Sequence, residues 1–333
     1  MRVAVSFLPE SVAELVECAR ESENAGFAHV GVGDSQSLYR ELWVCSGLVA
    51  AATTRVGVGP RVTNPVTRHP AVTASAIATL DEVSNGRAFL GLGTGDSAVL
   101  NVEARPARLD ELRSYTLAVR DLLTGGEATY GGRKSRLTWA RRCPPIYLAV
   151  AGPKGLRLAG EIADGVIAHT GFRPENVADT LERIEAGARA SGRRLSDVDV
   201  WWLALVSQND TVEAAYDLVR PSLAAYAHSG FAAGLADRQI PPDLADPVQR
   251  LVTGYRHSEH AKPGAERPNA RLVRELGLTE YLASRFALCG PPDAIRAQAQ
   301  AAERTGASQL WLTVHYADKL GFIRSFRDVL QTL

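Results

Sequence analysis

The sequence predicts an α/β protein of the (β/α)8 (TIM) barrel class, with an insertion between strands seven and eight. Short apolar segments alternate with helical segments throughout the 333 residues, and helical returns between strands imply parallel pairing. Segments such as Arg55–Gly59 and Arg87–Gly93 are apolar at successive positions, which is typical of strands covered on both faces. No linker rich in Pro, Gly and Ser lies near the midpoint, where two doubly wound domains would need a boundary.

Each strand is predicted from a short apolar run bounded by turn residues. The predicted strands are Arg2–Leu8, His29–Asp34, Arg55–Gly59, Arg87–Gly93, Pro145–Gly152, Asp164–Gly171, Val198–Val206 and Gln309–His315.

The helices are predicted from apolar residues at helical spacing. In the first, Ser11–Ala25, Ser11 and Glu14 have the spacing of a capping box, and Gly26 is a natural stop. The others are Glu41–Thr53, Ala71–Ser84, Leu109–Leu123, Pro153–Ala163, Pro174–Ser191, Thr211–Ala227, Arg271–Arg285, Pro292–Thr305 and Lys319–Leu330. The stretch His228–Asn269 is irregular, so we expect one domain over 1–333 with an insertion at about 228–285 over the barrel mouth.

Composition excludes several classes of partner. The 37 basic and 37 acidic side chains cancel, so no net charge attracts nucleic acid or an anionic membrane. The N-terminal segment has no secretory pattern, and no apolar run has the length of a membrane span. The four scattered cysteines are typical of reduced, buried thiols, which predicts a cytoplasmic protein.

The glycine run in "GLGTGDS", Gly91–Ser97, superficially resembles a dinucleotide-binding loop. Its spacing is G-x-G-x-G rather than G-x-G-x-x-G, it follows the fourth strand, and a polar, proline-interrupted segment comes after it. These three departures argue against a nicotinamide Rossmann dehydrogenase. In a barrel the same run is the carboxyl end of a strand, where glycine lets a flat ligand approach the backbone.

Polar residues follow most of the predicted strands, at the end where barrel enzymes place their sites. These strand ends are Ser6–Phe7, Asp34–Ser35, Arg61–Asn64, Thr94–Ser97, Ala151–Gly155, His169–Gly171, Ser207–Gln208 and His315–Tyr316. Asp34 or Asp96 alone could be a helix cap, so the prediction of an active site rests on the placement of both at strand ends. The segment "AGPKG", Ala151–Gly155, is either an anion site at a helix N-terminus or an ordinary proline-initiated helix start.

Four blocks resemble the bacterial luciferase-like superfamily, and within it the methylenetetrahydromethanopterin reductase branch. The blocks are Val58–Ser97, Ala151–Thr170, Cys289–Leu312 and the first unit through Ala25–Ser35. The resemblance implies a (β/α)8 barrel, FMN or coenzyme F420 as cofactor, and a non-prolyl cis peptide bond that maps onto Arg61–Val62. It also implies cofactor contacts from Ser6, Val62, Thr63, Asn64, Thr94, Gly95, Ser97, Gly152, Pro153, Lys154, Gly155, His169 and Thr170.

Three positions depart from the reductase pattern. Ser6 replaces a glutamate of the first strand, Ser35 replaces a frequent histidine, and Arg61 replaces the glycine before the cis bond. These changes argue against the archaeal pterin substrate and predict a relative with the same cofactor cradle and different chemistry.

The predicted function is hydride transfer between FMN or F420 and a small organic substrate with an activated C=C, C=N or C=O group. Asp96 is the first candidate for proton donor or substrate-orienting group, and Asp34 is the second. Alternatives are an FMNH2- and O2-dependent monooxygenase, supplied by a flavin reductase, and a non-catalytic barrel that pairs with an active paralogue. We expect a homodimer. We expect no metal site, because the pair His257 and His260 lacks nearby carboxylates of clear geometry.

Overall fold

The computed structural model describes residues 1–333 except 233, 260, 261, 263 and 315. In this part of the chain, eight parallel strands form the wall of a barrel, and the prediction of a (β/α)8 fold is confirmed. These strands are β1 (Arg2–Phe7), β2 (His29–Val32), β3 (Gly57–Pro60), β4 (Leu90–Leu92), β7 (Ile146–Val150), β8 (Gly165–Ala168), β9 (Asp199–Gln208) and β11 (Gln309–Thr313).

The strands follow the order β3-β2-β1-β11-β9-β8-β7-β4. Parallel bridges between Val58 and Ala88 and between Thr63 and Leu92 join the two ends of this order. The sheet therefore curls back on itself, and the carboxyl ends of all its strands meet at one mouth.

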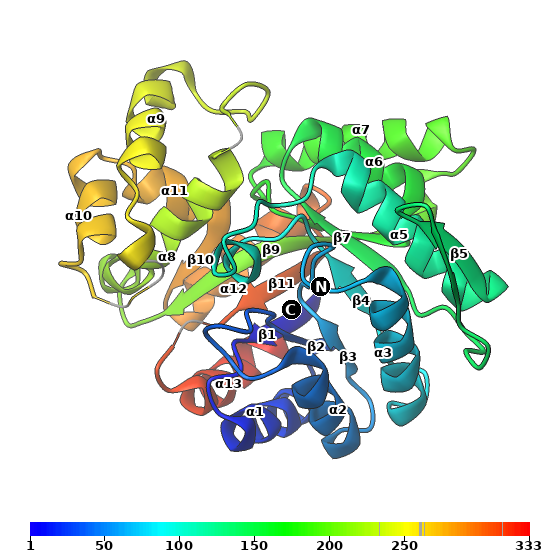
Figure 1. The fold of residues 1–333 in the computed structure, drawn as a ribbon. Coiled ribbons are helices and arrows are strands. Elements are labelled where there is room, and N and C mark those ends of the chain that lie inside the picture. Colours follow the sequence, from blue (N-terminus) through cyan, green and yellow to red (C-terminus); the bar gives the residue numbers. More distant parts are fainter. Residues whose placement is uncertain (233, 260–261, 263, 315) are drawn as a thin grey trace.

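Helices surround this wall, as Figure 1 shows. The helices that follow barrel strands are α1 (Val12–Ala25), α2 (Leu42–Ala52), α3 (Pro70–Val83), α5 (Leu109–Gly125), α6 (Pro153–Ile162), α7 (Pro174–Ala190), α8 (Val212–Phe231) and α13 (Lys319–Leu330), and α12 (Pro292–Arg304) precedes β11. The first begins as its sequence predicts: the Ser11 hydroxyl accepts a hydrogen bond from the Glu14 amide at 3.5 Å. Gly26, at φ +101°, ends it.

A layer of aromatic rings fills the amino end of the barrel. The rings of Phe89, Trp201 and Trp311 lie 5.1–5.6 Å from the His29 ring. A Cβ on Gly57 would lie 2.0 Å from Nδ1 of His29. Glycine at that position therefore leaves the space that the aromatic layer occupies.

Several elements were not predicted. They are the hairpin β5 (Glu127–Tyr130) and β6 (Arg133–Arg136), α4 (Ser97–Leu100), α9 (Ala245–Gly254), β10 (Ala287–Gly290), and the 3-10 helices Leu195–Asp197, Pro242–Leu244 and His257–Glu259. The hairpin is mostly exposed and polar, and the other strand and helices are short, so their residues carry little periodic signal.

The segment between β9 and β11 differs most from its prediction. Helix α8 runs over Val212–Phe231, beyond the predicted end at Ala227, and contains Pro221. The single helix predicted over Arg271–Arg285 is two helices, α10 (Pro268–Glu275) and α11 (Thr279–Phe286). Figure 1 shows α8 to α11 gathered on one side of the barrel.

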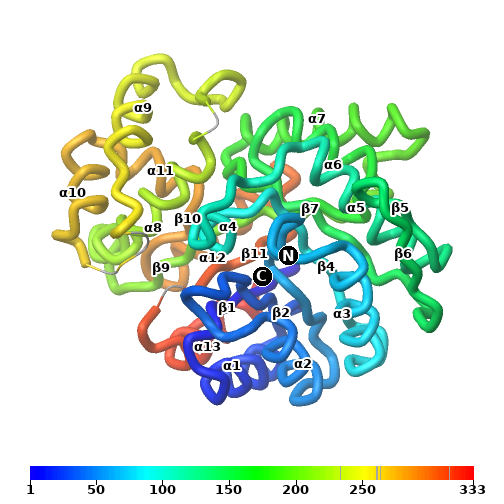
Figure 2. Tube along the Cα trace, in the orientation of Figure 1, coloured from blue at the N-terminus to red at the C-terminus, as the bar shows by residue number. Residues whose placement is uncertain are grey.

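The two chain ends lie together (Figure 2), where the Met1 amino group donates to the Leu333 carbonyl at 2.6 Å. Among the described helices, none has the length and apolar character needed to cross a membrane.

Candidate active site

The predicted site residues lie in or just after six strands, at their carboxyl ends. Ser6 is in β1; Asp34 follows β2; Val62, Thr63 and Asn64 follow β3; Thr94, Gly95, Asp96 and Ser97 follow β4; Gly152, Pro153, Lys154 and Gly155 follow β7; His169 and Thr170 follow β8. Since these strands are parallel, all of these residues stand at the mouth.

The peptide bond between Arg61 and Val62 is cis, as the resemblance implies. The chain then rejoins the sheet, because the Thr63 amide donates to the Gly91 carbonyl at 3.0 Å. A Cβ on Gly91 or on Gly93 would lie 3.0 Å from the Val62 side chain. These two glycines therefore accommodate the bulge at Val62, whereas the sequence suggested that they open the backbone to a flat ligand.

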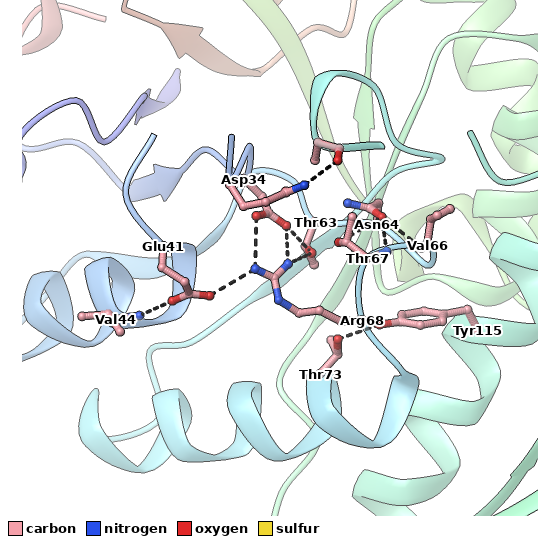
Figure 3. A network of polar contacts seen from close by, with 12 residues as sticks. Asp34, Glu41, Val44, Thr63, Asn64, Val66, Thr67, Arg68, Thr73 and Tyr115 are labelled. Carbon is pink, nitrogen blue, oxygen red and sulfur yellow. Dashed lines mark hydrogen bonds and ion pairs between the residues drawn. The ribbon is translucent and has the colours of Figure 1, made fainter. Parts of the chain in front are cut away.

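Asp34 holds this bulge from the neighbouring strand (Figure 3). Its carboxylate accepts hydrogen bonds from Arg68 at 2.6 Å and from the Thr63 hydroxyl at 2.7 Å. The second amino group of Arg68 also contacts Glu41 at 3.1 Å. With a side chain 1% exposed and both oxygens engaged, Asp34 is suited to positioning Thr63 rather than exchanging protons.

Asn64 shapes the loop after β3. Its side-chain oxygen accepts hydrogen bonds from the amides of Val66 and Thr67 at 2.9 and 3.0 Å (Figure 3). This arrangement is an Asx turn, in which the Asn64 side-chain oxygen stabilises the loop.

The loop after β4 turns sharply at Gly95, whose φ is +100°. A Cβ there would lie 2.4 Å from Val99, so a side chain is excluded by both conformation and space. The next residue, Asp96, is exposed, and its side chain makes no capping bond to α4. Burial and the charge of Asp96 raise the pKa of Tyr255, which places this carboxylate near the segment after α9.

The "AGPKG" segment forms the start of α6. Gly152 is the N-cap and Pro153 occupies the first helical position. The amides of Lys154 and Gly155 lie in the first turn, where an α-helix supplies no acceptor for them. Lys154 is exposed, so a positive side chain stands beside the positive end of the helix.

Three residues absent from the predicted set complete this region. Arg238 donates to the Ala151 carbonyl, and a Cβ on Gly152 would lie 3.1 Å from its guanidinium. Asn176, in the first turn of α7, is 1% exposed, and neither its amide nitrogen nor its oxygen has a partner. Both residues line one small cavity with Arg285, and the carboxylates Asp179 and Asp237 line it as well.

Sequence patterns gave no signal for these three residues. Arg238 lies in the stretch predicted as irregular, and Asn176 and Arg285 lie on helical segments where polar residues are common. Only the packing of α7, α11 and the segment after α8 brings them together.

His169 is neutral in this setting. Burial, reinforced by the positive charges of Arg61, Arg285 and Arg238, lowers its pKa to about 3. Its ring packs against Tyr226 at 4.7 Å between centroids.

Its neighbour Thr170 is buried and accepts a hydrogen bond from the Thr180 hydroxyl at 2.8 Å. Thr170 also lines the cavity of Arg238 and Asn176.

Ser6 is buried on β1 and contacts Arg61. The Ser6 hydroxyl accepts a hydrogen bond from Nε of Arg61 at 2.9 Å and donates to the Leu312 carbonyl at 3.2 Å. Arg61 therefore reaches across the mouth from β3 to β1.

Two predicted features fall partly outside the described residues. His257 packs edge-on against Tyr255, with centroids 5.4 Å apart, but His260 lies outside the described residues. His315, at the predicted end of the eighth strand, also lies outside them.

The mouth as a whole offers donors to an anion. The first turn of α6, the partly used guanidinium of Arg238 and the unpartnered amide of Asn176 converge on one edge. Such a set fits a phosphate or carboxylate group.

Comparison with known proteins gives the same architecture. A 5,10-methylenetetrahydromethanopterin reductase from Methanolobus tindarius is 29% identical over 319 residues, covering 93% of both chains. An F420-dependent glucose-6-phosphate dehydrogenase from Nakamurella multipartita is 32% identical over 266 residues, covering 73% of this chain and 78% of the relative.

Among solved structures, the coenzyme F420-dependent tetrahydromethanopterin reductase from Methanopyrus kandleri superposes with a TM-score of 0.78. It is 23% identical, and the match covers 99% of this chain and 98% of the reductase. The family model described as luciferase-like monooxygenase matches residues 2–309. With its barrel, its cis bond at the predicted position and this match over most of its length, the chain belongs to the luciferase-like monooxygenase family.

Proposed function

We propose that this protein is an F420-dependent oxidoreductase that transfers a hydride between coenzyme F420 and a small organic substrate. The substrate would carry an activated C=C, C=N or C=O group. Similarity to reductases and dehydrogenases whose names include F420 or a tetrahydromethanopterin substrate supports this choice. Because FMN serves other members of the superfamily, FMN is the alternative cofactor.

The anion cradle at the start of α6 is the observation that carries the proposal. Both candidate cofactors carry a phosphate, and the cradle combines a helix N-terminus with Lys154, Arg238 and the unpartnered amide of Asn176. Asp179 and Asp237 line the same cavity and offset part of this positive charge, but the helix N-terminus and the Asn176 amide still lack acceptors that a bound anion would supply. The residues present therefore fit the phosphate of the cofactor.

The remaining contacts would follow from this anchor. Gly152, Pro153, Gly155 and Thr170 surround the cradle, and Val62, Thr63 and Asn64 form the bulge against which the ring would lie. Ser6, Thr94, Gly95, Ser97 and His169 stand around it at the other strand ends. When bound, the deazaflavin supplies the hydride or accepts it.

Asp96 would orient the substrate or hold the proton exchanged with it. Its carboxylate is exposed at the mouth, and no described residue caps or pairs with it. Asp34 would act as a positioning residue, because its oxygens already hold Thr63 and Arg68.

A side-by-side fluorescence titration with F420 and FMN tests the proposal. We expect wild-type protein to bind F420 at least tenfold more tightly than FMN, and Arg238→Gln to weaken F420 binding at least tenfold. Arg105→Gln, which changes an exposed arginine paired with Glu111, should bind F420 as wild type does.

Two results would count against the F420 assignment, and a third would count against the anion cradle. Preferential FMN binding with O2 consumption after reduction would identify the monooxygenase, which would then need a flavin reductase. Absence of binding to both cofactors would favour the non-catalytic barrel. Equal F420 binding by wild type and Arg238→Gln would remove the cradle from the site.

We also propose that the insertion at about 228–285 covers the mouth and that the protein is a cytoplasmic homodimer. Arg238 and Arg285 reach the mouth from that segment, which supports the cover. Apolar side chains on α2 and α3 support the dimer, since Val44, Leu48 and Val72 are 63%, 42% and 55% exposed. The four cysteines are free thiols, which suits a reducing compartment.

A further inference from the structure

Arg61 extends its guanidinium across the barrel mouth. Nε donates to the Ser6 hydroxyl at 2.9 Å and Nη2 donates to the Thr313 hydroxyl at 2.8 Å. Thr313 also accepts from the Tyr226 hydroxyl at 2.8 Å, so β1, β11 and α8 together hold the side chain. The residue as a whole is intermediate in exposure, so it is not sealed within the barrel.

The hydrogen bonds of Arg61 leave most of its donors unused. A guanidinium has five N–H groups, and the two contacts with Ser6 and Thr313 use two of them. Arg87, which also has no carboxylate within hydrogen-bond distance, makes five hydrogen bonds, four to backbone carbonyls and one to the Thr53 hydroxyl. Arg285 likewise bonds three carbonyls and the Tyr281 hydroxyl.

No carboxylate of the described residues balances the charge of Arg61. Asp34 is paired with Arg68, and the groups that act on the neighbouring His169 are the cations Arg61, Arg285 and Arg238. Burial lowers the pKa of the Arg61 guanidinium, which means that part of its hydration is already lost. A cation withdrawn from water without a counter-ion is costly, and a bound anion would relieve that cost.

We propose that Arg61 binds a carboxylate of the substrate. This inference rests on the proposed function and narrows its substrate to carbonyl, imine or unsaturated compounds that carry a carboxylate. A planar guanidinium with free N–H groups matches a carboxylate in two parallel hydrogen bonds, which gives orientation as well as affinity. The fixed Ser6 and Thr313 contacts hold the guanidinium in place before the substrate arrives.

The test uses two matched probe pairs, benzoate with benzamide and acetate with acetamide, and protein loaded with oxidised F420. Calorimetric titration should show that at least one carboxylate binds wild type at least tenfold more tightly than its amide. Arg61→Gln should lose this preference while its F420 affinity stays within twofold of wild type. Arg105→Gln should keep the preference, because its charge lies on the exposed surface.

Ser6→Asp provides a second variant if Arg61→Gln fails to fold. It places a carboxylate next to Nε of Arg61, so a side chain of the protein takes the place of the bound anion. We expect the preference for carboxylates to disappear and the melting temperature to rise.

Several results would overturn the assignment. Equal affinity of carboxylates and amides for wild type would do so, as would a preference that survives both substitutions. A preserved preference with weakened F420 binding in Arg61→Gln would assign Arg61 to the cofactor ring. If wild type fails to bind F420, the proposed function fails, and the same titration without cofactor still tests Arg61.

Discussion

At the amino end of the barrel, Asp199 accepts hydrogen bonds from Tyr147, Trp201 and Gln309, whereas at the mouth Arg61 and Arg238 keep unused donors. At the amino end, these hydrogen bonds join residues of the barrel wall to one another, next to a layer of packed aromatic rings. At the mouth, hydrogen-bond donors without a partner in the protein remain available to a bound ligand. This difference separates the residues that maintain the fold from those that would bind a ligand.

The mouth itself contains both kinds of residue. Asp34 and Arg68 satisfy each other, and the pair is largely buried, with side chains 1% and 14% exposed. Arg61 has no such partner. The comparison therefore predicts that substitutions of these arginines differ strongly in their effect on stability.

Arg68→Met should have the largest effect. It leaves the Asp34 carboxylate buried without its counter-ion, which typically lowers the free energy of unfolding by about 3–5 kcal/mol. Arg61→Gln should stay within about 1 kcal/mol of wild type, because it removes an unbalanced charge. Urea unfolding of both variants measures the contrast, and equal losses would contradict it.

Gly57→Ala tests the aromatic layer at the amino end. The added Cβ would lie 2.0 Å from the His29 ring, which Phe89, Trp201 and Trp311 confine. We expect a loss of about 3 kcal/mol from overpacking. Gly47→Ala is the matched control: nothing lies within 4 Å of its Cβ, and in α2 it should gain about 0.5–1 kcal/mol.

Asp96→Asn should leave the fold intact and reduce turnover. If the carboxylate orients the substrate or holds its proton, kcat should fall about a hundredfold while F420 affinity stays within twofold. Asp110→Asn, at an exposed residue paired with Arg108, serves as the control in steady-state assays. Turnover at the wild-type rate would remove Asp96 from the mechanism.

The ring nitrogens of His29 and Nε1 of Trp311 lack hydrogen-bond partners within the aromatic layer, and His29 should make the protein acid-sensitive. Burial, reinforced by the charge of Arg2, lowers its pKa to about 4 from 6.5. The unfolded chain therefore binds a proton more readily, and stability contributed by neutral His29 is lost as the pH falls from 6.5 towards 4.

This loss amounts to about 2 kcal/mol between pH 7 and pH 5. His29→Phe, which keeps a ring in the layer, should remove that share of the pH dependence in urea unfolding. An unchanged pH dependence would show that His29 does not cause it.

The sequence by itself determined the barrel, because alternating apolar runs and helical segments leave few ways to bury both faces of each strand. It also determined where the mouth is, since parallel strands place all their carboxyl ends together. The family resemblance located the cis bond between Arg61 and Val62. Local signals sufficed for these features because each depends on spacing along the chain.

Only the tertiary structure decided which polar groups pair with each other and which stay without a partner. Asp34 and Asp96 look alike in the sequence, yet Arg68 engages the first and the second stays exposed. Arg238 and Asn176 had no signal at all, because they meet "AGPKG" only through the packing of separate segments of the chain. A side chain's partners depend on contacts between distant segments, and no local spacing records them.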